Sequence, residues 1–125
     1  MDSYLKDLTL SLYERRHLAT HVPVRDCSSA QFQPAPKECH VNVDKWCLLN
    51  PAHKPVRGWL VIDMTALGHF RFVAHSVVQA EDGHRFDVTP QQSFVKHPFL
   101  EDEEMEEVYL LRNSGRNLIF IHHFL

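Results

Sequence analysis

The sequence of 125 residues has only three cysteines, and no two of them form a Cys-x-x-Cys pair. An odd cysteine count without paired spacing argues against a disulfide framework and against a cysteine-rich zinc site. The three thiols are therefore expected to be free, as they are in a reducing compartment, and we expect a cytoplasmic protein.

Sequence signals for membranes and nucleic acids are also missing. The first residues lack the basic and then apolar pattern of a secretory signal, and no apolar run approaches the length of a membrane span. The formal net charge is −3, and Arg15-Arg16 is the only adjacent basic pair. Because a nucleic-acid-binding surface needs a concentrated basic face, we expect neither a membrane nor a nucleic acid as partner.

The sequence contains no His-Glu-x-x-His motif, although its ten histidines leave a zinc site open as an alternative. Most of these histidines fall in predicted turns or near the end of the chain, where surface positions are expected. We therefore expect no metal and no other cofactor. The alternative zinc ligands would be Cys39, His40, His69, His75, His84, His122 and His123.

What the sequence does contain is an amphipathic stretch at residues 36–47. Read as a helix, it places Pro36 in the first turn, where a missing N–H costs nothing. Cys39, Val43, Trp46 and Cys47 fall at i, i+4, i+7 and i+8, which forms one apolar stripe. Near the helix N-terminus, free N–H groups and the helix dipole favour the thiolate form of Cys39. Cys39 is therefore a candidate nucleophile, whereas Cys47 is interpreted as a core residue.

The pattern along the chain predicts one α+β domain over residues 1–125, in which the cysteine-bearing helix packs on an antiparallel sheet. Apolar spacing, β-branched residues and turn-forming pairs locate the other elements. The expected elements are a short helix within 1–16, a lead-in up to residue 35, strands at 56–63, 70–78 and 85–89 with a turn at Asp82-Gly83, and a closing hairpin of 108–111 with 118–121.

Residues 101–107 form an acidic run. A solvated turn or the start of a helix is the first interpretation of such a run. A patch that binds a protein partner is the alternative.

The Asp82-Gly83 turn gives Cys39 two possible partners. His75 lies in one predicted strand and Asp87 in the next, with the turn about midway between them. Residues directly opposite in a hairpin have Cβ atoms within about 5.5 Å, so these two side chains are expected to share a hydrogen bond. A cysteine nucleophile needs a base, and the base needs a group that holds its tautomer. Taken singly, each residue has a structural alternative: Cys39 as a buried apolar residue, His75 as a core histidine and Asp87 as a brace for the turn.

The order of helix-borne Cys39, then His75, then Asp87 resembles the papain-like cysteine hydrolases, in particular the transglutaminase-like and NlpC/P60-like branches. His75-Ser76-Val77-Val78 and Asp87-Val88-Thr89-Pro90 are similar to the His-Ala-Trp and Asp-Pro-Thr parts of the transglutaminase-like signature, with Pro and Thr in the other order. Glu38-Cys39-His40-Val41-Asn42 followed by Gly58-Trp59 is similar to small uncharacterised bacterial proteins of the Cys-His-Asp type. The likeness extends over about residues 33–90.

This resemblance implies a papain-like fold and an oxyanion-stabilising glutamine shortly before the cysteine. Gln33 has the matching position and Gln31 is the fallback, while the backbone N–H of Cys39 is a second donor. Asn42 lies one turn from Cys39 and is expected to support the neighbouring loop. Glu38 beside the sulfur disfavours the thiolate unless its carboxylate points into solvent.

The function expected from these residues is a thiol-dependent hydrolase or acyltransferase with a Cys39-His75-Asp87 triad. Its substrate would be a peptide or protein amide, and the reaction would be hydrolysis, deamidation or transglutamination. The alternative is a papain-like binding or interaction module without turnover.

Overall fold

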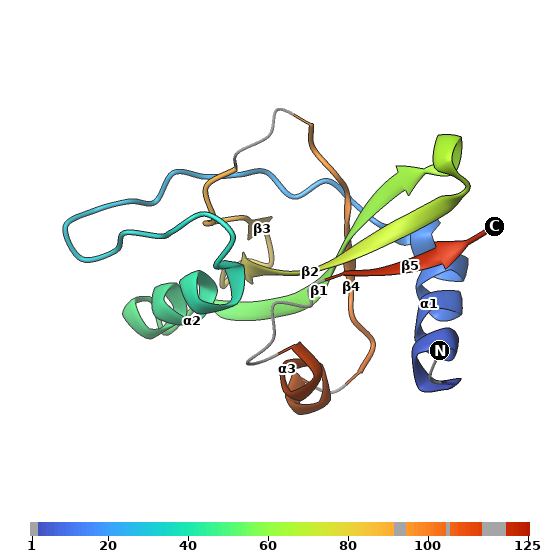
Figure 1. Ribbon diagram of the computed structural model, residues 1–125. Helices are drawn as coiled ribbons and strands as arrows, with labels where there is room; N and C mark the ends of the chain where they lie inside the picture. Colours follow the sequence, from blue (N-terminus) through green and yellow to red (C-terminus); the bar gives the residue numbers. More distant parts are fainter. Residues whose placement is uncertain (1–2, 92–94, 105, 114–119) are drawn as a thin grey trace.

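A curled antiparallel sheet forms the centre of the computed structural model, with helices packed around it (Figure 1). The structure describes residues 3–91, 95–104, 106–113 and 120–125. In chain order the elements are α1 (Ser3–Arg15), the 3-10 helix η1 (Arg16–Leu18), α2 (Cys39–Leu49), β1 (Lys54–Met64), the 3-10 helix η2 (Thr65–Leu67), β2 (His69–Gln79), β3 (Arg85–Phe86), β4 (Phe99–Glu101), α3 (Glu106–Asn113) and β5 (Phe120–Phe124).

The hairpin of β1 and β2 is the framework of the sheet. The two strands pair antiparallel over their full lengths, from Lys54 opposite Gln79 to Met64 opposite His69. The connection ends at Gly68, whose φ of +86° lies in the left-handed region that glycine adopts without a steric cost. Both predicted strands are thus confirmed, and each is longer than the sequence pattern indicated.

Different partners cover the two edges of this hairpin. β4 pairs with β1, whereas β3 and β5 both pair with β2, at opposite ends of that strand. β5 pairs with residues 69–73 and β3 with residues 78–79. Residues 74–77 of β2 lie between these two pairings, and His75 is among them. α2 packs against β2, which places the start of that helix beside this part of the sheet.

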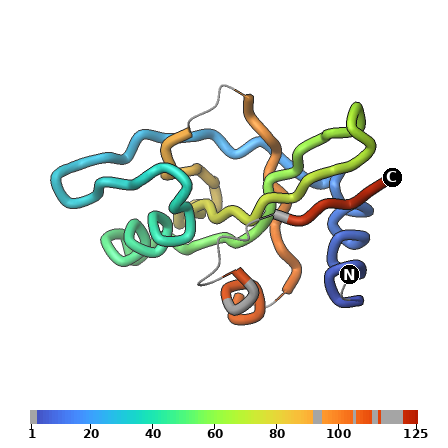
Figure 2. The backbone as a smooth tube through the Cα atoms, in the orientation of Figure 1, coloured from blue at the N-terminus to red at the C-terminus, as the bar shows by residue number. Residues whose placement is uncertain are grey.

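The lead-in before α2 crosses the sheet as an extended segment (Figure 2). It forms an antiparallel bridge between Thr20 and Phe99 and a parallel bridge between Val24 and Asp87. The lead-in is therefore hydrogen-bonded to the sheet, which its proline-rich sequence did not predict.

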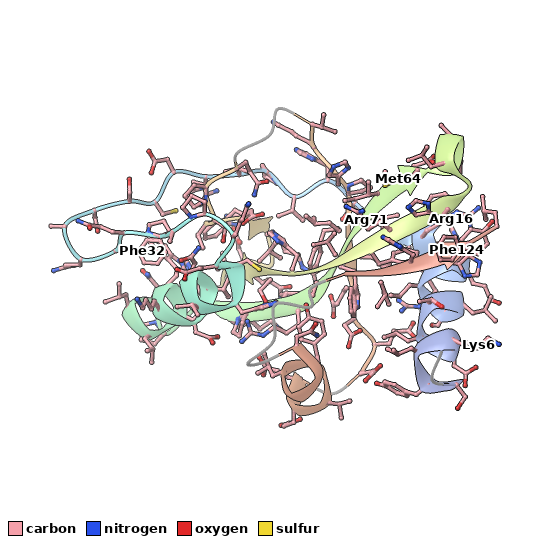
Figure 3. All side chains as sticks on the ribbon, in the orientation of Figure 1. Lys6, Arg16, Phe32, Met64, Arg71 and Phe124 are labelled. Atoms are coloured by element: carbon pink, nitrogen blue, oxygen red, sulfur yellow. The ribbon has the colours of Figure 1, made fainter. Side chains whose placement is uncertain are left out.

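Within the part of the chain that the structure describes, the core contains three clusters of buried side chains. A cluster that includes Leu12, Trp59, Phe72 and Tyr109 lies towards α1, and a second cluster contains residues of the lead-in, α2, β2 and the β3 region. Phe32 of this second cluster lies on the α2 side, whereas the labelled Arg16 and Phe124 lie at the α1 end (Figure 3). A third, smaller cluster consists of Val56, Val77 and Phe99, and the Phe99 ring contacts the His75 ring.

Three expectations need correction. The helix begins at Cys39 rather than in the turn at Pro36, so Cys39 is its first residue. Residues 108–111 belong to α3 and not to a strand, because the buried Tyr109 anchors this segment to β1 through its hydrogen bond to the Gly58 carbonyl. β5 accordingly pairs with β2, and the returning strand of 85–89 is limited to Arg85–Phe86. Residues 118–119 of the predicted closing hairpin lie outside the described residues. The short helix expected within 1–16 is confirmed as α1.

Within the described ranges, none of the helices is both long enough and apolar enough to cross a membrane.

Gly58 of β1 is expected to tolerate no side chain. A Cβ atom at this position would lie 2.3 Å from the carbonyl oxygen of Leu100 and 2.6 Å from the Phe99 ring. Overpacking of this kind costs about 1–3 kcal/mol, and the backbone atom cannot move aside. Gly58→Ala should therefore lower the free energy of unfolding by about that amount, measured by urea denaturation with an unchanged m-value.

The matched control for this substitution is Gly68→Asn. Nothing lies within 4 Å of a Cβ atom at Gly68, and asparagine tolerates the left-handed conformation. The control should change stability less than Gly58→Ala, and equal stability of Gly58→Ala and the unsubstituted protein would contradict the close approach of β4.

Candidate active site

Cys39 is buried at the first position of α2, with 8 % of its surface exposed. As the first residue of an α-helix, it has a backbone N–H that no carbonyl within the helix accepts. The N-cap residue Glu38 makes no side-chain capping bond and is exposed, so its carboxylate is solvated rather than directed at the sulfur. Lys37, just before it, has a φ of +65°, which is uncommon for a residue with a side chain.

His75 and Asp87 form the expected hydrogen bond. Nε2 of His75 donates to Oδ2 of Asp87 at 2.5 Å, and both side chains are buried. The strand register pairs Val78 with Phe86, so residue 75 would face residue 89, and Asp87 is the diagonal neighbour of His75 rather than its direct partner. A diagonal pair is still within reach of a ring and a carboxylate.

Other hydrogen bonds hold the Asp87 carboxylate in place. Its Oδ1 accepts from the backbone N–H of Thr89 at 2.9 Å, and its Oδ2 accepts from Nε2 of Gln91 at 3.3 Å. The backbone N–H of Asp87 donates to the carbonyl of Pro23 at 2.8 Å, and its carbonyl accepts from Arg25 at 2.9 Å. The carboxylate is therefore oriented before any substrate arrives.

Cys39 and His75 shift each other's pKa values in opposite directions. Burial alone would raise the pKa of the Cys39 thiol, but its interactions with His40 and His75 outweigh burial and lower that pKa to about 6. Burial alone would lower the pKa of His75, but Asp87 and Cys39 outweigh burial and raise that pKa to about 10. Between these two values the pair is a thiolate and an imidazolium.

A second histidine, His40, also lies at the site of Cys39, but its hydrogen-bond partners differ from those of His75. Its Nδ1 lies 2.6 Å from the hydroxyl of Ser76, the residue after His75. Arg57 of β1 donates to that hydroxyl at 2.9 Å. The buried Arg57 guanidinium also pairs with Asp44 of α2 at 2.6 Å and with Glu106 of α3 at 3.0 Å. The Arg57 guanidinium thus links both α2 and α3 to the sheet.

Sequence reasoning did not find this network. The available signal was an arginine, Arg57, inside an otherwise apolar strand, since a buried charge requires partners. The sequence gives no indication that those partners are Asp44 and Glu106.

Tyr109 of α3 bonds to the backbone at His75. Its buried hydroxyl donates to the carbonyl of Gly58 at 2.7 Å and accepts from the N–H of His75 at 3.1 Å. Burial raises the pKa of Tyr109 far above its ordinary value, so the hydroxyl stays neutral. The sequence pattern of residues 108–111 predicts a strand, and it therefore gives no indication of this role of Tyr109.

A cavity of about 240 Å³ opens beside Cys39. Cys39, His40 and His75 all line it, so both imidazoles and the thiol are presented to one space. Its other walls are mostly apolar, and polar groups from Thr89 and Gln91 complete them. The remaining lining residues are Lys37, Leu60, Val73, Ala74 and Pro90.

The structure does not bring Gln33 to this cavity. Gln33 is exposed and lines a different hollow with Pro34 and Val88, because the neighbouring Phe32 is buried in the cluster that contains Val43 and Val88. Gln31 is exposed as well. The expectation of Gln33 as the oxyanion donor therefore needs correction, and Gln91 is the glutamine that lines the cavity of Cys39.

Asn42 bonds to the neighbouring loop, as expected of a supporting residue. Its side chain accepts from the N–H of Ala35 at 3.1 Å, donates to the Ala35 carbonyl at 2.8 Å and donates to the Thr89 hydroxyl at 3.0 Å. It therefore links the turn before α2 to the segment after Asp87.

Side chains of the acidic segment bond within the chain. Glu101 pairs with Arg85 and Glu103 with Arg15, while Asp102 accepts from the Trp59 indole. Among the described residues, no three histidine, cysteine or acidic side chains are placed to hold a metal ion together.

No protein family, no curated protein and no solved structure matches this chain.

The three thiols should differ in the pH dependence of their alkylation. Burial raises the pKa of Cys27 and of Cys47, whereas that of Cys39 is lowered to about 6. Only the thiolate reacts with iodoacetamide, so the rate at Cys39 should rise through a midpoint near pH 6, and the other two should react only in alkaline solution. Peptide mapping by mass spectrometry resolves the three rates. Asp87→Asn should move the Cys39 midpoint upward, and a midpoint at or above 9 in the unsubstituted protein would contradict the pair.

Asn42→Leu should destabilise the fold. The change leaves the N–H of Ala35 and the buried Thr89 hydroxyl without their partner, while the Ala35 carbonyl keeps the long hydrogen bond from the N–H of Glu38 at 3.4 Å. Each unsatisfied buried group costs about 1–3 kcal/mol. We expect a loss of at least about 2 kcal/mol in thermal or urea unfolding. Asn50→Ala is the control, since the Asn50 side chain makes one bond, to the Trp46 carbonyl. A loss no larger than that of the control would contradict the bracing role of Asn42.

Proposed function

We propose that this protein is a papain-like thiol hydrolase or acyltransferase that acts on amide bonds through Cys39, His75 and Asp87. The observation that carries the proposal is the convergence of a low-pKa thiol and a carboxylate-held imidazole at one open cavity. The helix-borne cysteine packed on an antiparallel sheet supports the papain-like part of the proposal.

In the proposed reaction the Cys39 thiolate attacks the carbonyl carbon of the substrate. The carbon–sulfur bond forms as the carbonyl electron pair moves to oxygen, and the backbone N–H of Cys39, which has no acceptor within the helix, is a donor for that oxyanion. Asp87 occupies Nε2 of His75, so Nδ1 is the nitrogen that faces the reaction. The imidazolium gives its proton to the leaving amine, and a thioester with Cys39 remains.

A second nucleophile then attacks the thioester carbonyl and releases the Cys39 thiolate. Water, deprotonated by the now neutral His75, gives hydrolysis of a peptide bond or deamidation of a side-chain amide. An amine in place of water gives transglutamination. The apolar walls of the cavity favour a substrate whose acyl group carries little charge.

Acylation by an activated ester tests the proposal directly. 4-Nitrophenyl acetate should transfer one acetyl group to Cys39, seen as a mass increase of the intact protein and located by peptide mapping. Cys39→Ala should abolish the labelling, and His75→Ala should slow it by about 10²–10⁴-fold near neutral pH, because the base that ionises the thiol is lost.

The chain offers a matched control for the histidine variant. His84 is also hydrogen-bonded to an aspartate, Asp82, but this pair is exposed on the hairpin turn. His84→Ala should leave the acylation rate within about twofold, an expectation that follows from the small effect of surface substitutions. Equal rates for His75→Ala and the unsubstituted protein would overturn the proposal.

A further inference from the structure

Gln33 lies outside the cavity of Cys39, whereas His40 lines it. We propose that the Nε2–H of His40 donates a hydrogen bond to the oxyanion that forms when the Cys39 thiolate attacks an acyl group. This role rests on the proposed acyl transfer at Cys39, and it assigns to His40 a contact with the reacting atoms.

His40 lies next to the reacting thiol. It follows Cys39 in the first turn of α2, and the two side chains line the same cavity of about 240 Å³. The His40 ring also interacts with the Cys39 thiol in the resting protein. When the thiolate attacks, the negative charge moves from sulfur to the carbonyl oxygen, which is two bonds away. A donor beside the sulfur is therefore close to both positions of the charge.

The hydrogen-bond network fixes which ring nitrogen carries the hydrogen. Ser76 is fully buried, so its hydroxyl must be satisfied inside the protein. Its oxygen accepts from Arg57, which can only donate, and its hydrogen is left for an acceptor. Nδ1 of His40 lies 2.6 Å away and is that acceptor. A neutral imidazole that accepts at Nδ1 carries its hydrogen on Nε2.

The Nε2 atom of His40 is buried and lacks a nitrogen or oxygen acceptor among the described residues. Buried donors are nearly always paired, and the His40 ring contacts the Cys39 thiol, at which the substrate carbonyl would be attacked. An oxyanion beside Cys39 supplies the missing acceptor. Together with the backbone N–H of Cys39, His40 completes a pair of donors, the usual composition of an oxyanion hole.

Two reagents separate this role from thiol activation. Iodoacetamide alkylates Cys39 by displacing iodide at carbon, and no charge develops on a carbonyl oxygen. 4-Nitrophenyl acetate acylates Cys39 through a tetrahedral oxyanion, which then expels 4-nitrophenolate and leaves the thioester. The ratio of the acylation rate to the alkylation rate, measured where Cys39 is fully ionised in each variant, reports on the oxyanion alone.

The matched variants are His40→Met and His40→Gln. Methionine and glutamine have similar size, but only glutamine keeps an N–H donor near the position of Nε2. We expect the ratio to fall at least about tenfold in His40→Met and to stay within about threefold of the starting value in His40→Gln. An unchanged ratio in His40→Met, or an equal fall in both variants, would overturn the role of His40.

If His40→Met does not fold, Ser76→Ala provides the second measurement. Without the serine hydroxyl the hydrogen can occupy either ring nitrogen, so the ratio should fall several-fold, and an unchanged ratio would overturn the proposal. Failure of the proposed function has a different signature. In that case Cys39 of the unsubstituted protein would show an ordinary alkylation midpoint, whereas failure of the His40 role alone leaves a midpoint near 6 with an unchanged ratio.

Discussion

The hydrogen bond from His75 to Asp87 is the interaction on which the site depends. It joins β2 to the segment after β3 inside the protein, where a lone carboxylate would be strongly disfavoured. The N–H of Thr89 and the side chain of Gln91 also donate to this carboxylate, and the lead-in holds the backbone of Asp87 from the other side. The lead-in is therefore part of the site's support.

A second buried charge lies behind the site, on the other strand of the central hairpin. Arg57 pairs with one carboxylate from α2 and one from α3, and it donates to Ser76 beside His75. The Arg57 side chain is buried whereas both carboxylates are about half exposed. A buried charge requires partners, so these two pairs link both helices to the sheet. Two separate hydrogen-bond networks, one around Asp87 and one around Arg57, therefore hold the Cys39 thiol and the His75 ring in their relative positions.

Much of this arrangement follows from local sequence patterns. β-branched runs and the Asp82-Gly83 pair determine the hairpins, and the turn brings His75 near Asp87 without any knowledge of the rest of the chain. The apolar spacing of α2 likewise places Cys39 at a helix N-terminus. These features depend on neighbours within about a dozen residues, where periodicity and turn chemistry are informative.

The features that the sequence did not predict depend on distant contacts. Val108-Tyr109-Leu110-Leu111 fits a strand or a buried helix equally well, and only its packing on β1 and β2 decides for the helix. Gln33 has the expected spacing from Cys39, but spacing does not determine direction in a segment with Pro34 and Pro36. The link from Arg57 through Ser76 to His40 joins three separate elements, and no local pattern encodes it.

The protonation state of His75 tests the central claim most directly. In a nitrogen-15 NMR spectrum of the histidine rings, recorded midway between the Cys39 pKa of about 6 and the His75 pKa of about 10, both ring nitrogens of His75 should carry hydrogen. Cys39→Ala should lower the pKa of His75, since the thiolate contributes to raising it. A neutral His75 ring at that pH in the unsubstituted protein would contradict the thiolate–imidazolium pair and the acyl-transfer chemistry built on it.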